Sequence, residues 1–182
     1  AQVVERAQAL SQTAVDHDPR VSVDQASFSV VSGASVIVTS RGIRQSDEDA
    51  ALTMSLMGLA VDGAETGGFD YRGAVVRSYA EVEAELRRIA REVARACIGN
   101  LGATAGKSYK GPVAFAPAAF ASSFLSPLLG GISAIAVQRG RSALAGKVGE
   151  TIAPGLTLID DPTDPKVAGA RAFDREGLPA RK

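Results

Sequence analysis

The spacing of hydrophobic residues changes along the chain, and each change marks a different kind of element. Before the His17-Asp18-Pro19 break, apolar residues recur every three or four positions, which predicts an amphipathic helix over residues 2–15. From Val21 to Val76 short β-branched and apolar runs alternate with glycine, which predicts an antiparallel meander. The expected strands are Phe28–Val31, Val36–Thr39, Leu52–Val61 and Phe69–Val76. The expected turns are Ser32–Gly33, Arg41–Gly42, Asp62–Gly63 and Gly67–Gly68.

The strongest helix signal follows the meander. Ser78 and Glu81 have the S-x-x-E spacing of a capping box, which satisfies free backbone N–H groups at a helix start. Apolar residues then follow at spacings of four, three and four, and Gly99 is the expected end of the helix. These apolar residues are Val82, Leu86, Ile89 and Val93. The arginines of this helix are balanced by glutamates, which favours a solvated face over a nucleic-acid-binding stripe.

A glycine-rich stretch over residues 99–111 predicts a linker and a domain boundary. After it we expect a short strand at Pro112–Phe115, a helical stretch at Ala118–Val137 and a second strand at Leu156–Ile159. Pro127 and the Gly130-Gly131 pair are expected to interrupt the helical stretch. The chain is therefore predicted to be α+β. A mainly antiparallel sheet with packed helices over residues 1–105 precedes a smaller mixed α/β unit over residues 106–182.

Composition narrows the function classes. Of 182 residues, 46% are hydrophobic and 22% charged, which is typical of a soluble globular protein. Twenty basic residues balance twenty acidic ones, so no net positive field draws in nucleic acid or an anionic membrane. The segment from Pro112 to Val137 has no charge, but its prolines and glycines favour buried helices over a membrane span. The single cysteine, Cys97, fits a reducing, cytoplasmic location.

No motif in the chain predicts a catalytic, cofactor or metal site. Gly102–Ser108, GATAGKS, has one residue too few for a phosphate-binding P-loop and follows a helix instead of a strand. His17 is read as a surface loop residue and Cys97 as a buried packing residue, since no histidine is near to activate it. The carboxylates at positions 47–49 are expected to form a solvated turn. Those of Asp160, Asp161 and Asp164 are expected to supply turn and cap hydrogen bonds.

Several motifs resemble the TldD/PmbA family, whose members are called modulators of DNA gyrase or microcin-processing peptidases. In the second half they are GPVAFAP, RGRSALAGKVGETIAPGLTLIDDP and FDREGLPAR. In the first half ERAQAL, DPRVSVDQASFSVVSG, SRGIR and GGFDYRGA follow in the family's order and resemble the PmbA (TldE) branch. The resemblance implies a piece from the middle of a longer protein. Residues 1–105 would then be the end of an N-terminal domain, and residues 106–182 the start of a C-terminal domain.

In that family the TldD subunit carries an HExxxH zinc-protease helix, in which two imidazoles hold Zn²⁺ and a carboxylate activates water. Counting back from Gly140-Arg141-Ser142, the positions matching the histidines are Leu125 and Gly130, and Ser126 matches the glutamate. None of these side chains can perform that chemistry. The resemblance therefore implies a non-catalytic subunit with no metal of its own, whose TldD-type partner would carry zinc.

Two functions remain open from the sequence. The first is a partner subunit of a cytoplasmic metallopeptidase that processes peptides or unfolded proteins. The second is a non-enzymatic protein that binds DNA gyrase or another target. Expected partners are a TldD-type subunit or a second copy, and a peptide substrate, without nucleic acid or membrane. The helix with Phe120, Phe124 and Leu128 is the candidate contact, with core packing as the equal alternative.

Overall fold

The computed structural model describes residues 2–167 and 169–182, which divide into two compact units. The first unit is Ala1–Ala105 with Ile159–Lys182, and the second is Gly106–Leu158. Each is described separately below. Sequence analysis assigned residues 159–182 to the second domain. The compact units are defined by contacts in space, whereas the predicted domains are consecutive stretches of sequence. The predicted domain boundary at residue 105 therefore stays a prediction.

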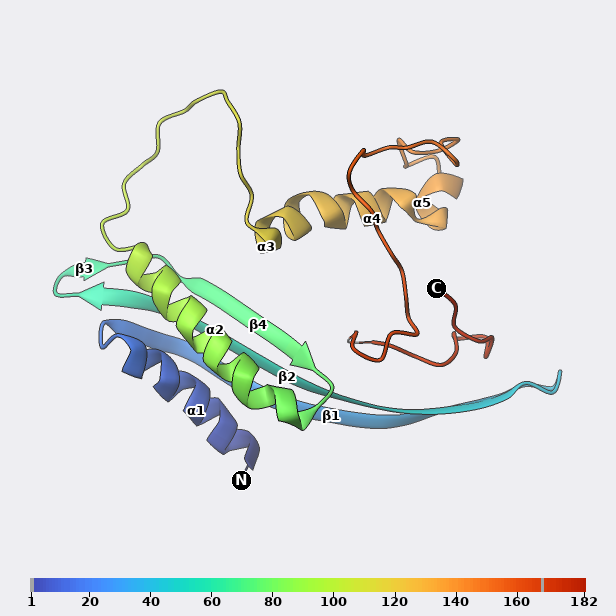
Figure 1. The fold of residues 1–182 in the computed structure, drawn as a ribbon, viewed down its shortest axis with the longest axis horizontal. Helices are drawn as coiled ribbons and strands as arrows, with labels where there is room; N and C mark the ends of the chain where they lie inside the picture. Colours follow the sequence, from blue (N-terminus) through green and yellow to red (C-terminus); the bar gives the residue numbers. More distant parts are fainter. Residues whose placement is uncertain (1, 168) are drawn as a thin grey trace. The chain divides into compact units, whose positions relative to one another are not determined.

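The first unit is a two-layer arrangement of helices on an antiparallel sheet (Figure 1). Its elements are α1 (Gln2–His17), β1 (Val21–Val38), β2 (Arg44–Asp62), β3 (Glu65–Thr66), β4 (Asp70–Val76) and α2 (Tyr79–Gly99). Strand β2 is central, because it pairs antiparallel with β1, β3 and β4. The α+β class and the antiparallel meander are thus confirmed.

The hydrophobic core lies between the two helices and one face of the sheet. Along β2, every second residue from Leu52 to Ala60 is buried and the residues between them are half-buried. This period of two is the signature of a strand with one covered face. On α2 the buried residues follow the helical period that the sequence predicts, from Val82 to Cys97. Full burial of each large apolar side chain stabilises the fold by about 1.5–3 kcal/mol.

Ser78 caps the start of α2 as predicted, although its hydroxyl bonds the Ala80 amide and not the Glu81 amide that a capping box uses. The Ser78 hydroxyl accepts a hydrogen bond from the Ala80 amide at 3.3 Å, and the Ser78 carbonyl accepts one from the Glu81 amide at 3.1 Å. Ser78 itself has extended backbone angles, as an N-cap residue should. The helix ends at Gly99, as expected.

The predicted turn at Ser32–Gly33 is wrong. Strand β1 runs through it without a break, and Gly33 lies opposite Asp49 of β2. The predicted turn at Arg41–Gly42 is confirmed: the chain reverses there, and Gly42 has a φ of +89°, which favours glycine. Two of the predicted runs are therefore one long strand. Residues 47–49, predicted as a solvated turn, lie within β2.

The second unit holds short helices and irregular chain. They are α3 (Pro117–Phe120), the π-helical turn η1 (Ala121–Leu125), α4 (Ser126–Ile132) and α5 (Ala134–Gln138). Pro127 does not interrupt them, because the Ser126 amide bonds back to Ala121 in the wider π turn and Pro127 then falls in the first turn of α4. The break comes at Ser133 instead of at Gly130-Gly131.

The two strands predicted around this unit are absent from the described residues. Pro112–Phe115 and Leu156–Ile159 have no regular structure, since neither run has a partner strand to pair with. Phe124 lies against Phe115 and Phe120, with ring centroids 4.9 and 5.5 Å apart. Among the helices of the described residues, none is long and apolar enough to span a membrane.

Arg20 joins the turn after α1 to the end of β2, and this gives a pH prediction. Its guanidinium donates to the Asp18 carboxylate at 2.8 and 3.0 Å and to Asp62 at 3.1 Å. These hydrogen bonds from Arg20 lower the pKa of Asp18 to about 2. Because this pKa is lowered by folding, the stabilisation is present above the unfolded pKa of about 3.9 and is lost as pH falls toward 2.

We expect Arg20→Gln to raise the pKa of Asp18 toward that unfolded value, because the neutral amide no longer stabilises the carboxylate. Carboxyl-carbon NMR titration of both proteins measures this shift. Arg87→Gln, on an exposed part of α2, is the control and leaves the pKa of Asp18 unchanged. An Asp18 pKa that is the same in Arg20→Gln and in the unsubstituted protein would contradict the assignment.

Candidate functional site

The outer half of the β1–β2 hairpin extends beyond the two helices (Figure 1). We call residues 32–49 the hairpin arm. A two-stranded ribbon is at best marginally stable in water, so the arm needs a cover on at least one face. Residues 169–182, which we call the C-terminal loop, supply this cover on the face opposite α1 and α2.

Asp174 organises the C-terminal loop. Its carboxylate accepts hydrogen bonds from the Glu176 and Leu178 amides, both at 2.9 Å. Its backbone amide donates to the Leu178 carbonyl at 2.9 Å, and Phe173 forms an isolated antiparallel bridge with Pro179. A short side chain that caps its own turn in this way is typical of aspartate. The sequence FDREGLP therefore encodes a compact turn.

Two contacts fix this turn on the hairpin arm. The Asp47 carboxylate accepts a hydrogen bond from the Ala172 amide at 3.0 Å, across 125 positions of sequence. Gly177 lies so close to the arm that an added Cβ would be 2.5 Å from Cγ2 of Ile43 and 3.2 Å from Cγ2 of Ile37. Its φ of +80° also disfavours any side chain. Only glycine therefore allows this approach.

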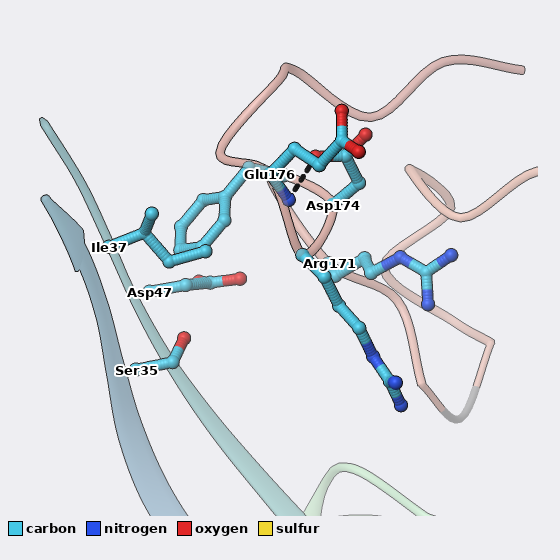
Figure 2. A pocket seen from close by; sticks show the side chains of 8 residues that line it. Ser35, Ile37, Asp47, Arg171, Asp174 and Glu176 are labelled. Atoms are coloured by element: carbon cyan, nitrogen blue, oxygen red, sulfur yellow. Dashed lines mark hydrogen bonds between the residues drawn. The ribbon is translucent and has the colours of Figure 1, made fainter. Parts of the chain in front are cut away.

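A pocket of about 580 Å³ lies between the hairpin arm and the C-terminal loop. Figure 2 shows side chains from the two strands facing the loop across it. The lining residues are Ser35, Ile37, Asp47, Arg171, Phe173, Asp174, Arg175 and Glu176. They include three carboxylates and two guanidinium groups beside an apolar isoleucine and phenylalanine. Such a lining can bind a polar segment of mixed charge, such as part of a polypeptide.

The pocket combines four residues of the FDREGLPAR motif with Asp47 of the acidic run. Neither histidine nor cysteine lines it, so it offers no imidazole or thiolate for nucleophilic catalysis. His17 is the exposed last residue of α1, not a loop residue. Cys97 is fully buried as predicted, and burial raises the pKa of its thiol. Asp161 and Asp164 accept hydrogen bonds within their own turns, also as predicted.

Sequence reasoning missed the role of Asp47 because its partner is remote. A carboxylate in an acidic run is ordinarily solvated, and nothing local indicates an amide 125 residues away. Glycine and aspartate spaced within FDREG are a turn signal that could have marked the C-terminal loop as ordered. Asp49, two residues on, instead pairs with Arg77 at 2.6 Å.

The residues at the expected zinc positions do not fit a zinc ion. Leu125 belongs to η1, and Ser126 and Gly130 belong to α4. Their side chains supply neither imidazole nor carboxylate. Throughout residues 2–167 and 169–182, no three histidine, cysteine, aspartate or glutamate side chains are grouped closely enough to hold a metal. That the complete protein has no metal of its own stays a prediction.

Comparison with known families defines the class of protein. Residues 1–101 match the PmbA/TldA metallopeptidase central domain, and residues 108–182 match the PmbA/TldA metallopeptidase C-terminal domain. The chain therefore belongs to the PmbA/TldA metallopeptidase family. A comparison with curated proteins finds no match.

Solved structures of the same fold come from three organisms. TldE from Thermococcus kodakarensis has 24% identity over 98% of this chain, with a TM-score of 0.72. A proposed modulator of a DNA gyrase from Thermotoga maritima has 22% identity over 97% of it and a TM-score of 0.77. A proposed modulator of DNA gyrase from Bacteroides thetaiotaomicron has 23% identity over 99% and a TM-score of 0.79. The chain spans 40%, 40% and 41% of their lengths, respectively.

We expect Gly177→Ala to loosen the C-terminal loop from the hairpin arm. The added methyl group collides with Ile43, and alanine at positive φ costs about 1–2 kcal/mol in addition. Trypsin cleavage after Arg171 and Arg175 measures the loosening and should become several-fold faster. Gly149→Ala is the matched control, since Gly149 has φ of +87° but nothing within 4 Å of an added Cβ. Equal cleavage rates at these arginines in both variants and the unsubstituted protein would refute close packing.

Proposed function

We propose that this chain is a PmbA/TldE-like subunit of a TldD-type zinc metallopeptidase complex that processes peptides or unfolded proteins. The observation that carries the proposal is the residue set Leu125, Ser126 and Gly130, which replaces the HExxxH side chains in a member of a metallopeptidase family. A TldD-type partner would hold the zinc and activate the attacking water.

The contribution of this chain is then to bind and orient substrate. Its pocket between the hairpin arm and the C-terminal loop presents carboxylates, guanidinium groups and apolar carbon together, which suits a polypeptide of mixed composition. In the second unit, Phe120 of α3 and Phe124 of η1 are 38% and 48% exposed. These two side chains offer apolar area to a partner subunit or a second copy. We place the complex in the cytoplasm, consistent with a single, unpaired cysteine among the described residues.

A second candidate function is a non-enzymatic modulator that binds a target such as DNA gyrase. It is favoured by the solved structures of similar fold from Thermotoga maritima and Bacteroides thetaiotaomicron, which are described as proposed gyrase modulators. The zero net charge of the chain supports contact with a protein over direct contact with DNA.

Reconstitution with a TldD-type subunit from the same genome tests the leading proposal. We expect the full-length protein alone to leave an unfolded protein substrate intact, and the mixture with zinc to cleave it. A Glu→Gln change in the HExxxH motif of the TldD-type subunit should abolish cleavage without loss of complex formation, because it removes the base and keeps the metal ligands.

Two results would reject it. Zinc-dependent cleavage by the full-length protein alone would show that it carries its own catalytic centre. Cleavage by the TldD-type subunit at the same rate with and without this protein would show that it is not a functional subunit. If DNA supercoiling by purified gyrase changed when this protein alone was added, the modulator function would be favoured.

A further inference from the structure

Charge is distributed unequally along the chain, although the chain as a whole has a net charge of zero. The second unit has a single acidic residue, Glu150, which pairs with Lys147 at 3.1 Å. Its basic residues are Lys107, Lys110, Arg139, Arg141 and Lys147, and each of them is exposed. From Lys107 to Lys147 the sequence has no aspartate or glutamate. The second unit therefore carries a local positive field, which attracts a polyanion.

A strongly exposed tyrosine lies between two of these basic residues. Tyr109 is 71% exposed, and Lys107 and Lys110 flank it within two positions of sequence. Every residue from Gly102 to Gly111 is exposed. Among the described residues, neither lysine side chain takes part in an ion pair or hydrogen bond, so both ammonium groups are available to a ligand from solvent.

Two contacts hold the Tyr109 ring in place despite its exposure. Its hydroxyl donates a hydrogen bond to the Pro112 carbonyl at 3.2 Å. The ring also lies against Gly111, where an added Cβ would be 3.3 Å from Cε2 and 3.5 Å from Cδ2 of Tyr109. A ring that is already ordered loses less conformational entropy when a ligand packs on it. The exposed part of the ring is therefore a preformed flat surface.

The combination of a flat aromatic ring with flanking cations decides which polyanion fits. Ammonium groups bind phosphates, and an aromatic ring stacks on a nucleic-acid base, as in proteins that bind single strands. In a duplex the faces of the bases are covered by their neighbours, so the ring cannot reach them. An acidic protein surface would engage the lysines and leave the ring without a partner.

We propose that Lys107, Tyr109 and Lys110 bind single-stranded nucleic acid. One base stacks on the Tyr109 ring, and the two lysines bind phosphate groups beside that base. Arg139 and Arg141 add to the positive field that draws the strand to the second unit. DNA and RNA strands share the base and phosphate chemistry that this site uses. The site is separate from the pocket at the hairpin arm and does not depend on the proposed peptidase complex.

The test measures binding of fluorescent oligonucleotides to the full-length protein by fluorescence polarisation at low salt. The probes are a single DNA strand and a single RNA strand of about 12 nucleotides, the matching DNA duplex and an abasic strand with the same phosphates. We expect the single strands to bind at least fivefold more tightly than the duplex and the abasic strand. Tighter binding of either the DNA or the RNA strand, with the same dependence on Tyr109, assigns the ligand to that class.

Substitution of the aromatic ring separates stacking from charge. Stacking on one aromatic side chain contributes about 1–3 kcal/mol, so Tyr109→Ala should weaken binding of the single strands about fivefold or more. Tyr109→Phe keeps the ring and should bind within threefold of the unsubstituted protein. Tyr71→Ala removes a tyrosine of β4 that is 60% exposed, and this matched control should leave the affinity unchanged.

The salt dependence of binding tests the two lysines. Each phosphate contact contributes about −0.7 to the slope of log affinity against log salt for a single strand. Lys107→Gln and Lys110→Gln together should therefore make the slope shallower by about 1.4. Lys166→Gln, at an exposed lysine of the first unit, is the matched control and should keep the slope of the unsubstituted protein.

Three results would overturn the proposal. The first is the absence of binding to either single strand up to about 100 μM protein at low salt, where even non-specific binding is measurable. The second is equal affinity in Tyr109→Ala and Tyr71→Ala. The third is displacement of the strand by polyglutamate at equal charge, which would assign the basic surface to an acidic protein instead.

Discussion

A two-stranded ribbon needs an external cover, and this constraint shapes the site of the protein. The hairpin arm extends past α1 and α2, so the core of the sheet cannot hold it. The C-terminal loop supplies the missing layer through one hydrogen bond from Ala172 to Asp47 and one close approach at Gly177. The pocket between arm and loop is a consequence of this contact. Residues far apart in sequence therefore line a single pocket.

The rest of the first unit is a rigid support for these surfaces. Helices α1 and α2 cover one face of the sheet, and the fully buried side chains of Met54, Leu56 and Ile89 hold the two layers together. The same packing places α1 against β1 and α2.

Local chemistry made the body of the fold predictable. The period of two in β2 and the capped, periodic helix α2 were evident because each depends on neighbouring residues alone. Two predictions based on isolated local signals were wrong. Ser32-Gly33 suggested a turn, although pairing with β2 carries the strand through it, and Pro127 suggested a break that the π turn before it absorbs.

The candidate site was harder to predict because it depends on contacts between remote residues. Asp47 lies in an acidic run that is ordinarily solvated, and its partner amide is 125 residues away. The family motif around Asp174 and Gly177 was visible in the sequence. The structural reason for glycine at position 177 is the close approach of the loop to Ile37 and Ile43. Sequence patterns identify such a motif without showing what it packs against.

Hydrogen–deuterium exchange in an Asp47→Ala variant tests most directly whether the C-terminal loop holds the hairpin arm. A hydrogen bond to a charged acceptor contributes about 1.5–3 kcal/mol, so its loss should speed exchange of the arm amides at least tenfold. Amides of β2 from Leu52 to Ala60 should be unchanged. Glu48→Ala, the neighbouring carboxylate on the opposite face of the same strand, should exchange as the unsubstituted protein does. Unchanged exchange of the arm in Asp47→Ala, or equal acceleration in Glu48→Ala, would contradict this account.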